Sequence, residues 1–467
     1  MDFYTLKRWM YLAVIVSVVL VGCWASVRPT QAEDGHGRDR EHERHPVTPA
    51  RDPGVRGGMP GGGGPIVGLT ARELEFFADA KTEFEGAEGV ADGLGPRMNL
   101  DSCVGCHSQP ATGGTSPFVN PQVAFASKDG GTDRVPFFLR LNGPVQQAHF
   151  KFKPDGSRDG GVKNTATITG RTGAGGCVLA LPDFDAAAAT NNLVFRLPAN
   201  LFGAGLIENI PDRAILANQA ANSTIKKHQG IAGRANHNSV DGTISRFGWK
   251  AQNKSLLLNA GLAYAVEMGI SNEMFPTERE ENPACQFATI PNDVTNTEAT
   301  ATPGGLNGIE KFAFFMRFLA PPTPSLTTPG GAYSIGHGRD LFVKVGCALC
   351  HTPTLTTGNA TVEALSNQPA NLFSDLLVHK MGPGLADDII QGQAQGDEFR
   401  SAPLWGLGQR IFFLHDGRTS DLLEAIQAHK SAGNAQFGPS EANAVIHNFN
   451  RLDEQQKQDV LNFLRSL

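Results

Sequence analysis

The chain has 467 residues, enough for two or three domains, and a formal net charge of −6 at pH 7. This slightly acidic balance argues against a nucleic-acid-binding protein, which would present a basic face. The 54 glycines and 29 prolines predict many turns and long loops rather than regular α/β layers.

The first 32 residues have the pattern of a signal sequence. Lys7 and Arg8 form a short positive region, and residues 9–22 form an apolar run too short to span a bilayer comfortably. This run ends at Cys23 in a setting that resembles the lipobox of bacterial lipoproteins, which predicts a lipid anchor on a membrane. The alternative is ordinary cleavage near Ala32. Both interpretations place the protein outside the cytoplasm, in the periplasm.

Residues 33–65 are predicted to be a flexible linker, because they alternate in charge and then become rich in glycine. Their histidines, His36, His42 and His45, are candidate metal ligands, although a solvated linker is the simpler interpretation. We expect a first domain at residues 66–325 and a second at 326–467.

The first domain begins with a predicted helix over residues 69–84, in which Leu74, Phe77 and Phe84 share one face. The motif Cys103-Val-Gly-Cys-His107 follows. Two thiols at this spacing reach both vinyl groups of a porphyrin, and the histidine supplies an axial nitrogen, so we expect a covalent c-type haem held by Cys103, Cys106 and His107.

Other interpretations of the motif, a zinc knuckle or a redox-active cysteine pair, are weaker, because no further zinc ligands stand nearby. Arg97, in the loop before the motif, is a candidate partner of a haem propionate, or else an ordinary surface arginine. No histidine occurs between Ser108 and Ala148. This absence suggests an open sixth iron position, as peroxide or dioxygen chemistry requires.

The next two hundred residues are rich in glycine and asparagine and contain only short apolar runs. This pattern predicts a long, irregular, loop-rich insertion with a few helices and a small sheet. Within it, Glu208 stands in an apolar glycine-rich run, which suits a general acid or base, or else a structural glutamate. Trp249 precedes a predicted helix over residues 255–268 and is a candidate electron relay, or else a packed core residue. Cys177 and Cys285 are expected to form a disulfide; two buried thiols are the alternative.

The second domain repeats the pattern of helix, motif and closing helix. A helix is predicted over residues 333–345, followed by Cys347-Ala-Leu-Cys-His351, which predicts a second covalent haem held by Cys347, Cys350 and His351. An amphipathic helix over residues 452–464 would pack across the first one. The candidate sixth ligands of this haem are Met381, His415 and His429. The expected fold is therefore mainly α, with two cytochrome c-like helical haem domains.

Three stretches near the C-terminus resemble the bacterial di-haem cytochrome c peroxidase superfamily. They are residues 399–404 (Phe-Arg-Ser-Ala-Pro-Leu), 412–417 (Phe-Phe-Leu-His-Asp-Gly) and 423–426 (Leu-Glu-Ala-Ile). The resemblance is closer to the branch of di-haem oxidoreductases sometimes labelled thiol oxidoreductases. It implies that the axial ligand of the second haem, counted from His415, is His429 rather than Met381. The family's calcium-binding run is replaced around residues 410–412, which argues against calcium.

The resemblance implies a peroxidase-like oxidoreductase. Haem 1 would take an oxidant such as peroxide, assisted by Glu208, while haem 2 would relay electrons from a small donor protein, a cytochrome c or a cupredoxin. Trp249 or Trp405 would bridge the two haems. The alternatives are a non-catalytic di-haem electron carrier and an oxygenase that acts on an organic substrate.

Overall fold

The computed structural model describes residues 48–128, 135–159, 168–169, 177, 179–277, 283–296 and 303–467. The predicted signal sequence, Cys23 and the three linker histidines (His36, His42 and His45) lie outside the described residues. Helices predominate in the described part and strands are short, which confirms the expectation of a mainly α fold. No helix among these residues is long and apolar enough to cross a membrane.

The α-helices are α1 (Ala71–Glu85), α2 (Cys103–Cys106), α3 (Pro121–Lys128), α4 (Phe184–Ala189), α5 (Ala204–Glu208), α6 (Asp212–Ala220), α7 (Ser223–Gln229), α8 (Leu256–Glu267), α9 (Gly308–Phe318), α10 (Gly331–Val345), α11 (Leu422–Gln427), α12 (Asn443–Asn450) and α13 (Glu454–Ser466). Five short 3₁₀ helices join them: η1 (Pro283–Cys285), η2 (Pro303–Gly305), η3 (Cys347–Leu349), η4 (Glu363–Leu365) and η5 (Leu407–Gln409).

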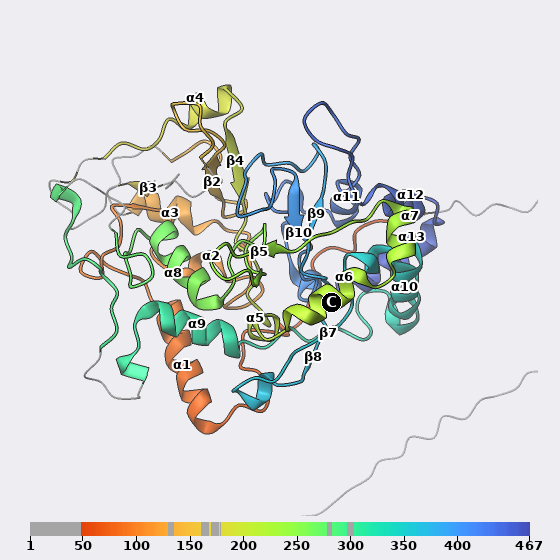
Figure 1. Cartoon of the computed structure of the whole chain (residues 1–467), viewed down its shortest axis with the longest axis horizontal. Coiled ribbons are helices and arrows are strands. Elements are labelled where there is room, and N and C mark those ends of the chain that lie inside the picture. The colour runs from red at the N-terminus through yellow and green to blue at the C-terminus, as the bar shows by residue number, and fades with distance from the viewer. Residues whose placement is uncertain are drawn as a thin grey trace, which may run out of the picture. The chain divides into compact units, whose positions relative to one another are not determined.

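The strands of the described residues form antiparallel two-stranded ribbons rather than one sheet. The pairs are β1 (Arg97–Met98) with β3 (Ile168–Thr169), β2 (Gln147–Phe150) with β4 (Leu193–Arg196), β5 (Asn236–His237) with β6 (Ile244–Ser245), β7 (Leu355–Thr356) with β8 (Pro369–Ala370), and β9 (Val378–Lys380) with β10 (Glu398–Arg400). In Figure 1, β9 and β10 lie between the helices α1, α2, α8 and α9 and the helices α10, α12 and α13.

The helix α1 packs against α9 near the first motif. Its N-terminus is a capping box, in which the Thr70 hydroxyl accepts from the Glu73 amide and the Glu73 carboxylate accepts from the Thr70 amide. Phe77 stacks on Phe315 of α9, with ring centroids 5.6 Å apart. Leu74, expected on the same buried face, is 42% exposed, because the neighbouring Phe76 ring makes the contact with Phe314 of α9 instead.

The helix α10 packs against α13 near the second motif, as predicted. The rings of Phe342 and Phe463 lie 5.5 Å apart, and the buried Asp459 carboxylate accepts hydrogen bonds from the Ser334 hydroxyl and from the His337 ring. Gly338 permits the close approach, because a Cβ at this position would lie 1.9 Å from the Asp459 carbonyl oxygen. The two motifs are thus each accompanied by a packed helix pair.

Residues 48–65, the described part of the expected flexible linker, contact the rest of the protein. The Asp52 carboxylate accepts two hydrogen bonds, of 2.7 and 2.5 Å, from the fully buried Arg465 of α13. The Arg56 amide donates to the Gly408 carbonyl. This corrects the expectation for these residues, because composition could not reveal an ion pair with a partner near the C-terminus.

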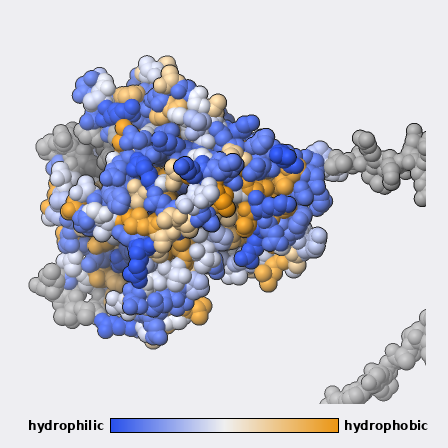
Figure 2. All heavy atoms as spheres, turned by 45° about the vertical axis from the view of Figure 1, so that its right-hand side comes forward, coloured by the Kyte–Doolittle hydropathy of each residue, from blue (hydrophilic) through white to orange (hydrophobic). Residues whose placement is uncertain are grey.

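Cys177 and Cys285 form a disulfide, which confirms the expected pairing. On the face of the molecule drawn in Figure 2, hydrophilic residues predominate and hydrophobic ones form scattered patches. The apolar side chains gather mainly in two buried clusters, one that includes Phe77, Phe84 and Phe315, and one that includes Phe342 and Phe463.

Candidate functional site

The first motif borders a cavity of about 230 Å³ that Cys103, Cys106 and His107 help to line. The motif forms the single turn α2, which closes with a hydrogen bond from the His107 amide to the Cys103 carbonyl. The His107 ring lies 3.0 Å from the Gly114 carbonyl through Nδ1. Because a carbonyl can only accept, Nδ1 carries the proton and Nε2 keeps its lone pair. Burial lowers the pKa of His107 to about 4, so the ring is neutral at pH 7.

The second motif borders a separate cavity of about 210 Å³, lined by Cys347, Cys350 and His351. His351 donates through Nδ1 to the Phe373 carbonyl at 3.0 Å and therefore also presents Nε2. Burial, with the nearby His429 as the next cause, lowers the pKa of His351 to about 4.

The three candidate sixth ligands, Met381, His415 and His429, all line the second cavity. His429 lies just beyond α11 and donates through Nδ1 to the Ala425 carbonyl at 2.8 Å. It therefore presents Nε2, like the two motif histidines. His415 instead stacks on Phe399, with ring centroids 4.3 Å apart. Met381 packs in a small apolar cluster that includes Phe399.

Two buried arginines that the sequence did not single out line the second cavity, Arg400 of β10 and Arg410. Burial lowers the pKa of each to about 10. The Arg400 Nε atom is buried without a hydrogen-bond partner among the described residues. A haem bound here would bring two propionates, and these guanidinium groups have the charge and the donors to bind them. The residues present therefore fit a haem.

Arg97, the expected propionate partner at the first motif, lies in β1 and pairs across that ribbon with Thr169. It does not border either cavity. Its expected contact with a haem propionate stays a prediction.

Trp249 lines both cavities, as does Arg400. Its indole Nε1 donates to the Leu197 carbonyl at 2.8 Å, and its ring meets His415 edge to face at 6.4 Å. Trp405 borders neither cavity; it belongs to the buried cluster of the first helix pair, where it packs against Gly203. Of the two tryptophans proposed as a bridge, only Trp249 lies between the cavities.

Glu208 makes contacts that hold helices together, and its expected acid–base role stays a prediction. Its carboxylate pairs with Arg317 at 2.7 Å and accepts from the Leu256 amide at the start of α8, also at 2.7 Å. It does not line the first cavity. The apolar run around it predicted burial near the haem, but the side chain ties α5 to α8 and α9 instead.

One face of α8 forms a wall of the first cavity, where Asn259, Ala260, Ala263, Tyr264 and Glu267 follow at helical spacing. Glu267 is the one carboxylate among the described residues that line this cavity. Its carboxylate accepts hydrogen bonds from the side-chain amides of Asn99, at 2.6 Å, and of Gln147. The His149 ring contacts the side-chain oxygen of Gln147 at 2.7 Å. Sequence reasoning predicted this helix but missed its polar face, which its spacing could have suggested.

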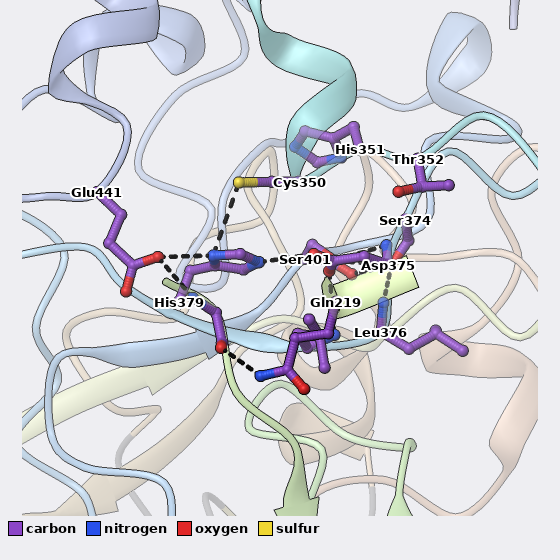
Figure 3. A network of polar contacts seen from close by, with 12 residues as sticks. Gln219, Cys350, His351, Thr352, Ser374, Asp375, Leu376, His379, Ser401 and Glu441 are labelled. Atoms are coloured by element: carbon purple, nitrogen blue, oxygen red, sulfur yellow. Dashed lines mark hydrogen bonds and ion pairs between the residues drawn. The ribbon is translucent and has the colours of Figure 1, made fainter. Parts of the chain in front are cut away.

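A network of polar side chains contacts the second motif at Cys350 (Figure 3). His379 lies between two carboxylates, with Nε2 3.0 Å from Asp375 and Nδ1 2.9 Å from Glu441. Nδ1 also lies 3.6 Å from the Cys350 sulfur. Burial opposes its charge, but Cys350 and Asp375 raise the pKa of His379 well above its usual value. Glu441 also accepts the Ala232 and Gly233 amides, so the network joins three distant segments.

Each of the two cavities thus has a paired thiol set and a neutral imidazole, the donor set of a haem protein with two haem sites. The family model described as "Di-haem oxidoreductase, putative peroxidase" matches residues 190–467, more than half of the chain. The chain therefore belongs to the di-haem oxidoreductase family, which confirms the resemblance found in the sequence. The match includes the second motif and α8, and begins after the first motif.

Among solved structures, the chain is similar to a Kuenenia stuttgartiensis hydrazine synthase, with 18% identity over 34% of this chain and 55% of that one and a TM-score of 0.22. It thus spans about half of that chain. It is also similar to a MauG-like protein associated with microbial copper homeostasis, with 17% identity over 58% of this chain and 89% of that one and a TM-score of 0.28. No curated protein gave a significant match.

Proposed function

We propose that this oxidoreductase reduces peroxide at haem 1 with electrons that enter through haem 2. Haem 1 is held by Cys103, Cys106 and His107, and haem 2 by the second motif. A bound c-type haem supplies an iron that exchanges electrons and that takes a small oxidant where its sixth position is open. The observation that carries the proposal is the difference between the two cavities: His429 lines the second in addition to the motif histidine His351, whereas His107 is the one histidine among the described residues that line the first.

His351 and His429 would hold the iron of haem 2. Both have Nδ1 held by a backbone carbonyl, which leaves the lone pair on Nε2, and both line the same cavity. The influence of His429 on the pKa of His351 agrees with two imidazoles that lie near each other. Met381 and His415 lack this arrangement and remain packing residues of the pocket.

A haem held by the first motif would have an open position for a small oxidant. His107 is the one histidine among the described residues that line the first cavity. Two methionines, Met268 and Met316, also line it, but both are buried members of the apolar cluster around α8 and α9. The rest of the wall is rich in amides and holds a single carboxylate, Glu267, as a site for a small polar oxidant would require.

Glu267 is the proton-transfer group at haem 1, in place of Glu208. General acid–base catalysis needs a carboxyl group near the reacting oxygen, and Glu267 is the one carboxylate among the described residues that line this cavity. Its hydrogen bonds from Asn99 and Gln147 hold both carboxylate oxygens in place. Trp249 provides the contact through which electrons pass between the two sites, since it lines both.

Two cytochrome c-like units account for this arrangement. Each motif is accompanied by one helix pair, α1 with α9 and α10 with α13, and the residues between the first motif and α9 form a long insertion. The disulfide between Cys177 and Cys285 supports export, because such bonds persist in oxidising compartments. We propose that a signal sequence ends at Cys23 or near Ala32, which N-terminal sequencing of the mature protein will decide.

The test of the proposed function is an electron paramagnetic resonance (EPR) spectrum of the ferric protein before and after peroxide. We expect one high-spin haem, which changes on addition of peroxide, and one low-spin bis-histidine haem, which does not bind it. Two low-spin haems whose EPR signals do not change on addition of peroxide would identify a pure electron carrier and refute the proposal.

The role of Trp249 is tested by Trp249→Phe, with Trp405→Phe as the matched control. Stopped-flow reduction of the peroxide-oxidised protein by a small cytochrome c or cupredoxin should be slower in Trp249→Phe and unchanged in Trp405→Phe. Equal rates in both variants would exclude Trp249 as the relay. The same experiment identifies which donor class the protein accepts.

A further inference from the structure

One buried cation borders both cavities. Arg400 is 8% exposed and lines the first cavity as well as the second. Its guanidinium Nη1 donates to the Arg246 carbonyl at 3.1 Å, and its Nε is buried without a hydrogen-bond partner among the described residues. No carboxylate of these residues offsets its charge. A buried charge without a counter-charge is costly, so the position of Arg400 points to an anion that is bound there.

The turn that carries Trp249 also holds Arg400 between the cavities. The Arg400 amide donates to the Trp249 carbonyl at 2.8 Å, while its guanidinium binds the carbonyl of Arg246 in the same turn. Trp249 and Arg400 are the two described residues that line both cavities. The guanidinium therefore lies at the partition between the two sites, where it can serve either of them.

The other arginine of the first cavity is already paired. Arg196 binds the Asp387 carboxylate through Nη2 at 2.6 Å and through Nε at 3.2 Å, and its Nη1 donates to Gln391 at 2.6 Å. Asp387 also lies 3.0 Å from the buried Lys250. Among the described residues that line the first cavity, Arg400 is thus the arginine left without a carboxylate.

A second unpaired arginine lies near Arg400, at the second cavity alone. Arg410 is 8% exposed, lines that cavity and not the first, and has no carboxylate of the described residues to offset its charge. Burial, and then the charge of Arg410, lower the pKa of Arg400 to about 10, so both groups stay charged at pH 7. Two neighbouring buried cations need anionic partners, and carboxylates match the planar donors of a guanidinium.

We propose that Arg400 is a carboxylate-binding residue shared by the two sites: it binds one propionate of haem 1 and one propionate of haem 2, while Arg410 serves haem 2 alone. The inference rests on the proposed function, because it requires a haem at each motif, but it involves no peroxide. A guanidinium has five N–H donors, and the Arg246 carbonyl takes one of them, so enough remain for two carboxylates.

A shared arginine links the two sites electrostatically, in addition to the contact that Trp249 provides. Because one positive charge is divided between two carboxylates, a change in its hold on one carboxylate changes its hold on the other. Such coupling is reciprocal. Arg400 would therefore set the reduction potentials of both haems, whereas Arg410 would act on haem 2.

Spectroelectrochemical titration of the di-haem protein without peroxide tests the shared role. Arg400→Met removes the charge and keeps a long side chain. We expect the midpoint potentials of both haems to fall, because a carboxylate without its cation favours the ferric state. Arg410→Met, the matched control, should lower the potential of haem 2 alone. A fall at only one haem in Arg400→Met, or no change at either, would overturn the inference.

A second variant keeps the proposal testable if Arg400→Met does not fold. Arg400→Lys retains the charge but loses the planar fork that binds a carboxylate through two hydrogen bonds. With isotope label in the propionate carboxyl carbons, infrared difference spectra are recorded on reduction of each haem in turn. We expect the carboxylate bands of both haems to shift in Arg400→Lys, and those of haem 2 alone in Arg410→Lys. Unshifted bands at either haem in Arg400→Lys would contradict a shared site.

The result is separate from that of the peroxide experiment. A haem 1 that does not respond to peroxide would refute the proposed reaction and leave these shifts expected. Unshifted potentials and bands would refute the shared arginine and leave the reaction as proposed. A mature protein with only one covalent haem, counted by mass spectrometry, would refute both.

Discussion

Replacing Glu267 with glutamine tests which carboxylate serves haem 1. The substitution keeps the size of the side chain but removes its ability to carry a proton. General acid–base catalysis contributes about 10²–10⁴-fold to a rate. At about 1.36 kcal/mol for each factor of ten, the loss corresponds to about 2.7–5.4 kcal/mol of activation free energy. We expect the rate constant for reaction with peroxide to fall by that factor.

The structure also predicts a smaller effect of Glu267→Gln on stability. Asn99 and Gln147 each donate to a different carboxylate oxygen, and a glutamine offers only one acceptor oxygen. The side-chain amide of Gln147 cannot rotate to exchange its nitrogen and oxygen without losing the contact between that oxygen and His149. One buried donor is therefore left unsatisfied, at a cost of about 1–3 kcal/mol in the free energy of unfolding. Urea unfolding of the variant measures this cost separately from the rate.

The matched control is Glu208→Gln. Glu208 pairs with Arg317 and caps α8 but does not line the cavity, so its substitution should leave the rate constant unchanged. Stopped-flow spectroscopy of the haem band with peroxide in excess gives the rate constants for both variants. An unchanged rate in Glu267→Gln with intact haem spectra, or an equal fall in Glu208→Gln, would refute the reasoning.

Three further predictions follow from the contacts described above. His429→Met should raise the reduction potential of haem 2 in a potentiometric titration and replace its bis-histidine EPR signal, because methionine favours the ferrous state; an unchanged signal would show that His429 is not the ligand. Asp52→Ala should lower the free energy of unfolding in urea by about 3–5 kcal/mol, because Arg465 is left as an uncompensated buried charge. Burial raises the pKa of Asp52, but Arg465 and backbone amides outweigh this effect and hold that pKa below its usual value. The stabilisation by Asp52 is therefore fully present above the pKa of an unfolded aspartate, about 3.9. It is lost as the pH falls through the lower pKa of the folded state. If wild type and Asp52→Ala differed by the same free energy of unfolding at pH 7 and at strongly acid pH, this prediction would be contradicted. Removing the disulfide by Cys177→Ala with Cys285→Ala should cost about 4.8 kcal/mol in the chain-entropy model for a separation of 108 residues; identical urea midpoints under oxidising conditions would contradict this.

Local pattern was sufficient wherever a structural feature depends on neighbours in the chain. Within each motif, Cys103–His107 and Cys347–His351, the spacing alone brings two sulfurs and an imidazole to the cavity that the motif borders. The helices α1, α10 and α13 follow from apolar spacing and from residues such as Thr70 and Gly346 at their ends. Composition failed for residues 48–65, because the glycine-rich sequence does not reveal that Asp52 meets Arg465.

The chain's sequence alone therefore predicted the two haem motifs, the helices beside them, the disulfide and the family. Tertiary structure alone decided which side chains face each cavity. Glu267 lines the first cavity and accepts hydrogen bonds from Asn99 and Gln147, which lie far away in sequence. Whether a carboxylate lines a cavity or ties helices together depends on what surrounds it in space, which is why the positions of Glu208 and Glu267 could be told apart only in the folded protein.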